Sequence, residues 1–163
     1  MPEAPALELA FAALEARLVA ALPDLKVERN RDAEVSENLC PLLVLRDGDY
    51  TITRGDQSGA YGLSLYRVSA AVEGYVTAGE EALLNTAITL AHARVVRAMV
   101  CDGGATPSPI PLAGGVTEIW PEEVSAARTA AAVVDSAAPF ASFVAGFEFD
   151  LRVPEGSPFF PIP

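Results

Sequence analysis

Hydrophobic and polar positions alternate along residues 62–76, a stretch that contains no proline. The two sets that this alternation separates are Val68, Ala70, Val72 and Val76 on one side, and Arg67, Ser69 and Glu73 on the other. A period of two is typical of a β-strand with one covered face. The pattern therefore predicts a long strand whose apolar face packs against the rest of the protein.

The spacing of the apolar residues changes after Thr77. It becomes three or four residues, as expected for the stripe of an amphipathic helix. The residues of this stripe are Leu84, Ile88, Ala91, Val95, Ala98 and Met99. Thr77 offers a capping hydroxyl, and Glu80 and Glu81 place negative charge in the first turn, where the helix dipole favours it. A long strand followed by a long helix is the expected central unit.

The first third of the chain predicts a helix and a hairpin. Residues 6–22 carry an apolar helical stripe that ends before Pro23. Residues 41–46 and 50–54 are rich in β-forming side chains and flank an Asp-Gly pair at Asp47. Two such runs around Asp-Gly are a strong hairpin signal.

The last third predicts a second long strand. Residues 140–153 alternate cleanly between apolar and polar side chains, whereas residues 122–136 are mostly alanine and are expected to be helical. The two long strands exceed the usual length of about 5–6 residues. Such strands bend at a bulge, for which Gly74 and Gly146 are candidates, or extend past the domain to meet a neighbour.

Together these segments predict an α+β fold, with a mixed, mostly antiparallel sheet of long strands packed against two main helices. Residues 1–153 are expected to form a single domain. Residues 154–163 are expected to be a proline- and aromatic-rich C-terminal arm, because prolines join a ladder poorly. Its apolar side chains, Phe159 and Phe160, have no later sequence to cover them, which favours a contact with another subunit. Deleting this tail is expected to weaken assembly and to leave the monomer folded.

The composition limits the function further. The chain has 163 residues, of which 51% are hydrophobic, so it is long and apolar enough for a real core. Its net charge is −11, and no cluster of Lys and Arg forms the basic stripe that nucleic-acid binding needs. No apolar run reaches the roughly 18 residues of a membrane span. The N-terminus lacks the basic start of a signal peptide, so we expect cytosolic synthesis and no membrane partner.

The sequence offers little chemistry. His92 is the single histidine and lies beside a helical stripe, so a structural role is favoured over catalysis. Asp47, Asp49 and Asp56 lack the spacing of a calcium loop, and the cysteines and histidine fall short of a zinc set. No phosphate-binding glycine motif occurs. We therefore expect no catalytic residue, no metal and no cofactor.

The residues favoured for subunit or partner contacts are few. Arg29 and Arg31 form the densest basic point of the first third, although a solvated sheet edge is the simpler interpretation. Arg54 is a third candidate polar contact. Phe159 and Phe160 are the candidate apolar contacts, placed as an arm on a neighbouring subunit.

The order of these segments resembles the tail terminator, or tail-completion, family of long-tailed bacteriophages and gene transfer agents. The resemblance covers most of the chain and lies in pattern and order. It is carried by residues 27–35 (VERNRDAEV), 41–49 (PLLVLRDGD), 65–76 (LYRVSAAVEGYV), 120–123 (WPEE) and 140–153 (FASFVAGFEFDLRV).

This resemblance implies a structural α/β subunit that forms a hexameric ring on the end of the tail tube. Such a ring stops tube polymerisation and offers a docking surface to the neck proteins of the head, and no enzyme activity is expected. The protein would then reside at the tail–head junction of the virion after synthesis in the bacterial cytoplasm. DNA would pass through its lumen without specific binding, and an acidic lumen would repel phosphates.

Three other interpretations stay open. The chain could be another neck or connector component, with the same assembly role and a different binding face. It could be a small enzyme or ligand-binding domain with a pocket near Thr77. It could also be an α+β protein whose oligomer is incidental.

Overall fold

The structure is a computed structural model that describes residues 3–54, 62–112, 117–129, 140–154 and 156–161. Its centre is a five-stranded sheet in the order β2-β3-β4-β8-β7. The strands are β2 (Lys26–Arg29), β3 (Leu42–Arg54), β4 (Leu63–Thr77), β8 (Phe140–Pro154) and β7 (Glu122–Thr129). Only β2 runs parallel to its neighbour, and all other pairs are antiparallel. The predicted fold class is confirmed.

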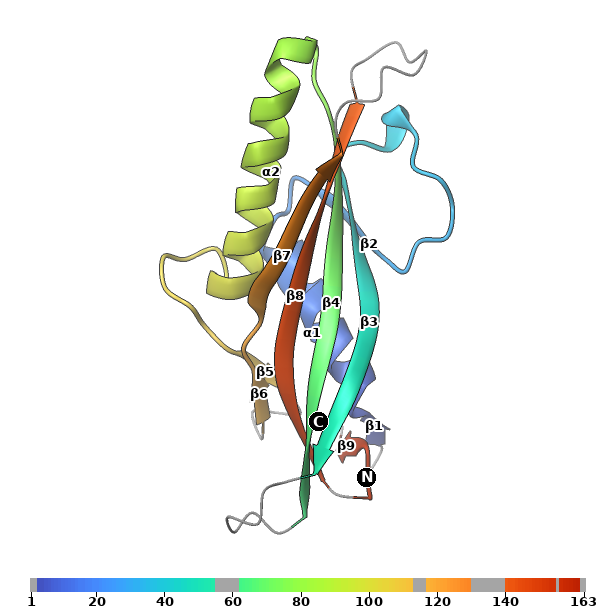
Figure 1. Ribbon diagram of the computed structural model, residues 1–163, viewed down its shortest axis with the longest axis vertical. Coiled ribbons are helices and arrows are strands. Elements are labelled where there is room, and N and C mark those ends of the chain that lie inside the picture. The colour runs from blue at the N-terminus through green and yellow to red at the C-terminus, as the bar shows by residue number, and fades with distance from the viewer. Residues whose placement is uncertain (1–2, 55–61, 113–116, 130–139, 155, 162–163) are drawn as a thin grey trace.

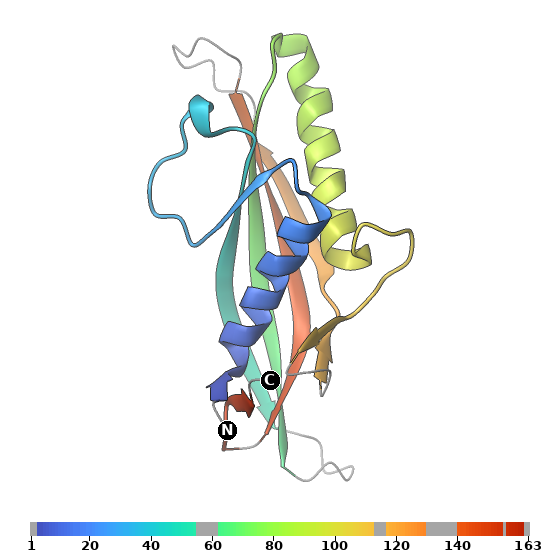
Figure 2. The ribbon, with the colours of Figure 1, turned by 180° about the vertical axis from the view of Figure 1, so that it is seen from behind.

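Both helices lie on one face of this sheet. α1 (Ala6–Ala21) crosses behind the long strands, and α2 (Glu81–Cys101) runs beside β7 and β8 (Figure 1, Figure 2). Two small ladders complete the fold, β1 (Glu3–Pro5) with β9 (Phe159–Pro161) and β5 (Ile110–Leu112) with β6 (Thr117–Ile119). A single 3-10 turn, η1 (Glu37–Leu39), precedes β3. Among the described residues, no α-helix covers the other face of the sheet (Figure 1).

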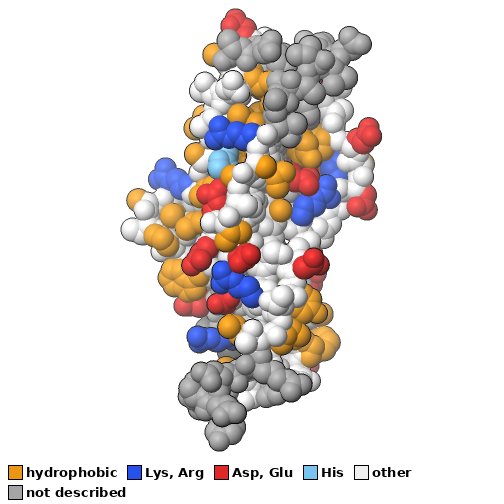
Figure 3. All heavy atoms as spheres, in the orientation of Figure 1, with side chains coloured by type: hydrophobic (Ala, Val, Ile, Leu, Met, Phe, Trp, Pro, Cys, Tyr) orange, Lys and Arg blue, Asp and Glu red, His pale blue; other side chains and the backbone are white. Residues whose placement is uncertain are grey.

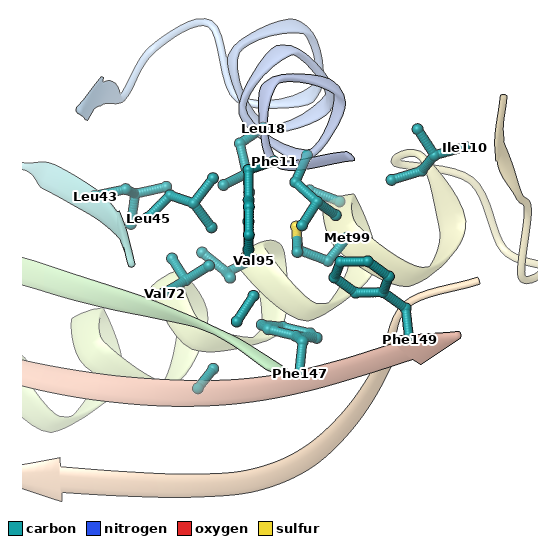
Figure 4. Close-up of a cluster of buried hydrophobic side chains, with 14 of the residues drawn as sticks. Phe11, Leu18, Leu43, Leu45, Val72, Val95, Met99, Ile110, Phe147 and Phe149 are labelled. Atoms are coloured by element: carbon teal, nitrogen blue, oxygen red, sulfur yellow. The ribbon is translucent and has the colours of Figure 1, made fainter. Parts of the chain in front are cut away.

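The core lies between the sheet and the two helices (Figure 4). The alternation in β4 and β8 places every second side chain on the face of the sheet that the helices cover. The apolar stripes of α1 and α2 pack against these side chains. The ring of Phe11 on α1 meets that of Phe149 on β8 edge-on, with centroids 6.2 Å apart. Burying each large apolar side chain in such a core stabilises the fold by about 1.5–3 kcal/mol.

The predicted hairpin at Asp47 is wrong, because β3 continues through the Asp-Gly pair. The register of β3 against β4 shifts between Asp47 and Tyr50, which marks a bulge. A β-carbon on Gly48 would stand 2.6 Å from the carbonyl oxygen of Ser69. Glycine is therefore required here by a close approach of two strands and not by a turn.

The predicted bulge at Gly74 is wrong, because β4 pairs with β3 and β8 there without any shift. At Gly146 the pairing with β4 is also regular, but the register of β7 against β8 shifts between Glu123 and Ser125, which lie opposite Phe147 and Gly146. A β-carbon on Gly74 would stand 2.1 Å from the ring of Phe143, and one on Gly146 would stand 2.3 Å from the hydroxyl oxygen of Ser125. These glycines make room for side chains of neighbouring strands.

Residues 122–129 form a strand where a helix was expected, and residues 130–136 lie outside the described residues. Pairing with β8 outweighs the helix propensity of alanine. The predicted cap of the second helix is wrong as well. Thr77 ends β4, and Glu80 occupies the N-cap position without a side-chain cap hydrogen bond.

Candidate interaction site

Arg29 is occupied within its own chain. It donates from Nε to Asp47 at 2.8 Å and from Nη1 to Glu8 at 2.6 Å, and its guanidinium lies 5.5 Å from the ring centre of Phe11. The hydrogen bonds to these two carboxylates raise the pKa of Arg29, and the bond from Arg29 lowers that of Glu8. The side chain thus ties α1, β2 and β3 together.

The second candidate, Arg31, makes its contacts within its own chain. Arg31 donates from Nη1 to Glu28 at 2.5 Å and from Nε to the carbonyl of Ala33 at 3.1 Å. Its own carbonyl accepts a hydrogen bond from Arg46. Arg54 is the last residue of β3, and its side chain lies outside the described residues. Arg31 thus bonds to neighbours in sequence, in the segment that precedes β3.

The two phenylalanines of the C-terminal segment have different surroundings. Phe160 is 5% exposed and belongs to the core of its own chain, whereas Phe159 is 43% exposed. Their strand β9 pairs antiparallel with β1 despite its proline, and the amide of Ala6 donates to the carbonyl of Pro158 at 2.8 Å. Of the two candidate apolar contacts, only Phe159 is exposed.

The two edges of the sheet offer further contact surfaces, at residues that the sequence interpretation did not name. β2 pairs only with Leu42 to Leu45, so among the described residues β3 has no neighbour on that side beyond Asp47. The outer side of β7 also has no partner in the described part of the chain. Residues 48–53 of β3 and residues 122–128 of β7 are exposed without interruption, whereas burial alternates along residues 68–76 of β4 and residues 141–153 of β8.

The open edge of β3 carries apolar side chains. Tyr50 is 48% exposed and Ile52 is 55% exposed, although each lies opposite a residue whose side chain faces the helices. The ring of Tyr50 stacks on that of Tyr66 with centroids 5.3 Å apart. An open, apolar strand edge is a template for pairing with another chain. The alternation of residues 50–53 in the sequence predicts a strand, but it does not show that this part of the strand is an open edge. That depends on how β2 and β4 align with β3.

The helix-free face of the sheet carries charged side chains interspersed with hydrophobic ones (Figure 3). Arg67 at its centre donates to Glu148 and to Asp150, both at 2.9 Å, so charges of both signs are paired. A shallow depression of about 170 Å³ lies where this face meets the β3 bulge. Its lining residues are Asp49, Tyr50, Thr51, Arg67, Val68, Ser69 and Glu148. None of them belongs to the strand-to-helix joint at Thr77, where the alternative of a small enzyme or ligand-binding domain would place a pocket.

His92 connects α2 to β7. Its Nε2 lies 2.7 Å from a carboxylate oxygen of Glu123, and its ring lies 5.3 Å from that of Phe143. Arg128, five residues after Glu123 on β7, donates to the hydroxyl of Thr89 on α2 at 2.9 Å. These contacts fix the edge strand β7 against the helix.

Within the described ranges, no group of His, Cys, Asp and Glu side chains is placed to hold a metal ion. No helix in the described part is long and apolar enough to cross a membrane. The chain matches no protein-family model, and no curated protein is significantly similar to it.

Proposed function

We propose that this protein is the tail terminator of a bacteriophage or gene transfer agent. In this proposal it forms a hexameric ring on the last ring of the tail tube, stops tube polymerisation and offers a docking surface to the neck proteins of the head. It is a structural subunit without a cofactor or a catalytic site. It resides at the tail–head junction of the virion.

The observation that carries the proposal is the sheet with two open edges. Its long strands leave residues 48–53 of β3 and residues 122–128 of β7 exposed, in an order of elements that resembles the tail terminator family. Proteins normally cover or blunt such edges, because they pair readily with other chains. A subunit whose two opposite edges are both open is suited to head-to-tail contacts, and such contacts close into a ring when the rotation allows.

The charge supports the same proposal. A net charge of −11 gives the chain a surface that repels nucleic acid. A lumen lined with carboxylates would let DNA pass without sticking to phosphate-binding side chains. Reversal of the lumen charges should therefore slow DNA ejection, and an unchanged ejection rate would count against this part of the proposal.

The test is tube growth in the presence of the protein. Tail tubes polymerised from the tube protein of the same phage or gene transfer agent should stop growing when the chain is added. Labelled chain should then appear at one tube end only. Continued growth with no end-bound label would overturn the proposal. Continued growth together with binding to head-side connector complexes would identify a neck protein instead.

A further inference from the structure

The two open edges of the sheet lie on opposite sides of the molecule, β7 on one side and β3 on the other (Figure 1). We propose that they are complementary halves of one subunit interface. Residues 50–53 of β3 in one copy pair antiparallel with residues 125–128 of β7 in the next copy. The inference rests on the proposed ring and adds its closing contact, a sheet that continues from subunit to subunit.

The backbone of β3 presents its hydrogen-bonding groups outward at the required residues. The amide of Asn30 donates to the carbonyl of Leu45 at 2.8 Å, on the side away from β4. In an antiparallel ladder every second residue bonds to the same side. Counted through the bulge to the pairing of Tyr50 with Val68, this alternation leaves the backbone groups of Tyr50 and Ile52 at the open edge.

The backbone of β7 matches it. Carried across β4 and β8, the same alternation directs the backbone groups of Ala126 and Arg128 to the open side of β7. Ala126 lies opposite Ala145, and Tyr50 lies opposite Val68. Because Ala145 and Val68 belong to the core, the side chains of Ala126 and Tyr50 lie on the helix side of the sheet. Since four antiparallel strands run from β3 to β7, β3 of one copy meets β7 of the next in opposite directions.

The side chains of the two edges are complementary in size. In the register that joins outward-bonding residues, Ile52 faces the small Ala126, and Tyr50 faces Arg128. A guanidinium over a tyrosine ring is a favourable contact. Cross-strand pairs of this kind stabilise antiparallel sheets.

The stagger of this pairing suits a closed ring. Within one subunit, Tyr50 of β3 pairs with Val68 of β4. Arg128 of β7 pairs with Phe143 of β8, which in turn pairs with Gly74 of β4. The two edge residues that would meet are therefore offset by six residues along β4. At about 3.3 Å per residue and about 4.8 Å between strands, this offset over four strands tilts them by about 45° from the ring axis. Closed barrels have tilts of about 35–45°.

A two-fold contact is the competing arrangement. Pairing of β3 with β3, or of β7 with β7, gives a closed dimer and leaves the other edge uncovered. Pairing of β3 with β7 covers both edges with one kind of contact. The test must therefore distinguish mixed from like pairs.

Disulfide trapping makes this distinction. In a full-length background with Cys40→Ser and Cys101→Ser, one chain carries Ile52→Cys and a second chain carries Ala126→Cys. Oxidation of the mixture should yield 52–126 heterodimers and little product from either chain alone. The control is Leu90→Cys, which is 60% exposed on α2 and belongs to neither edge strand. Pairs held in the interface should react about 100-fold faster than pairs with position 90, since contact raises their effective concentration into the millimolar range.

A proline gives a second, independent readout. Ile52→Pro removes an amide that points to the open edge and leaves the hydrogen bonds to β4 in place. It should abolish oligomers larger than the monomer and leave the circular dichroism spectrum unchanged, whereas Ile52→Val should assemble normally. Absence of the 52–126 product at every protein concentration, or a dominant 52–52 product, overturns the inference.

The outcomes separate this inference from the proposed function. If the protein stops tube growth but gives no 52–126 product, the interface is wrong and the terminator function stands. If the 52–126 product forms but tube growth continues, the interface stands and the terminator function is wrong.

Discussion

Arg17 provides a direct test of how this fold is stabilised. Its buried side chain on α1 joins that helix to the end of α2 and to the chain that follows α2. Its Nη1 donates to the carbonyls of Met99 at 3.1 Å and Ser108 at 2.9 Å, and its Nη2 donates to that of Pro109 at 2.5 Å. Burial lowers the pKa of Arg17, and the nearby Asp102 carboxylate partly offsets this. The guanidinium thus satisfies the Met99 carbonyl in the last turn of α2, where helix carbonyls lack an intrahelical partner, and two carbonyls of the chain that follows.

The change Arg17→Met keeps most of the apolar stem and removes all three hydrogen bonds. Each buried carbonyl left without a donor destabilises by about 1–3 kcal/mol. The Met99 carbonyl is fully enclosed, whereas water can reach those of Ser108 and Pro109 in part. Release of the buried charge offsets some of the loss. We therefore expect the free energy of unfolding to fall by about 3 kcal/mol, which lowers Tm by roughly 6–12 °C in a domain of this size.

The assay is urea unfolding followed by circular dichroism, with Arg97→Met as the matched control. Arg97 is exposed at the same end of α2 and donates once, to the carbonyl of Gly104 at 2.7 Å. Its loss should lower the free energy of unfolding by less than about 1 kcal/mol. An Arg17→Met loss no larger than that of Arg97→Met would refute the assigned role of Arg17.

Two further predictions follow from buried and paired groups. Phe160→Ala should lower the free energy of unfolding by about 3–5 kcal/mol, whereas Phe159→Ala should lower it by less than about 0.5 kcal/mol; equal losses in urea unfolding would contradict the placement of these two rings. Burial alone raises the pKa of Asp47, but hydrogen bonds from Arg29 and Asn30 outweigh it and hold that pKa below its ordinary value of 3.8. A lowered folded-state pKa stabilises above the unfolded value and is lost as pH falls through the folded one. Urea midpoints should thus fall more steeply on acidification below pH 3.8 for the parent than for Arg29→Met, and equal slopes would argue against this pairing.

The elements that the sequence predicts well are those whose pattern is long and regular. The helix over residues 6–22 and the strands over residues 62–76 and 140–153 appear within two residues of their expected ends. Glycine was the weak point. At Gly48 and Gly74 it marks close approach of another strand or ring, which depends on register and not on local preference.

The side chains that matter for contacts were harder to predict, because their roles depend on distant partners. Arg17 lies off the apolar stripe of its helix and would be placed in solvent, yet its carbonyl partners are more than 80 residues away along the chain. Arg29 looks like a surface cation until Glu8 and Asp47 are brought to it. Ile52 looks like an ordinary strand residue, since only the short length of β2 leaves its edge open.

The mass of the protein in solution, measured by sedimentation at rising concentration and followed by negative-stain imaging, tests the central claim most directly. We expect a hexamer of the 17.1 kDa chain, seen as a ring with an open centre. A closed two-fold dimer, or a species that stays at 17.1 kDa throughout the concentration range, would contradict a subunit built to assemble head to tail through its two sheet edges.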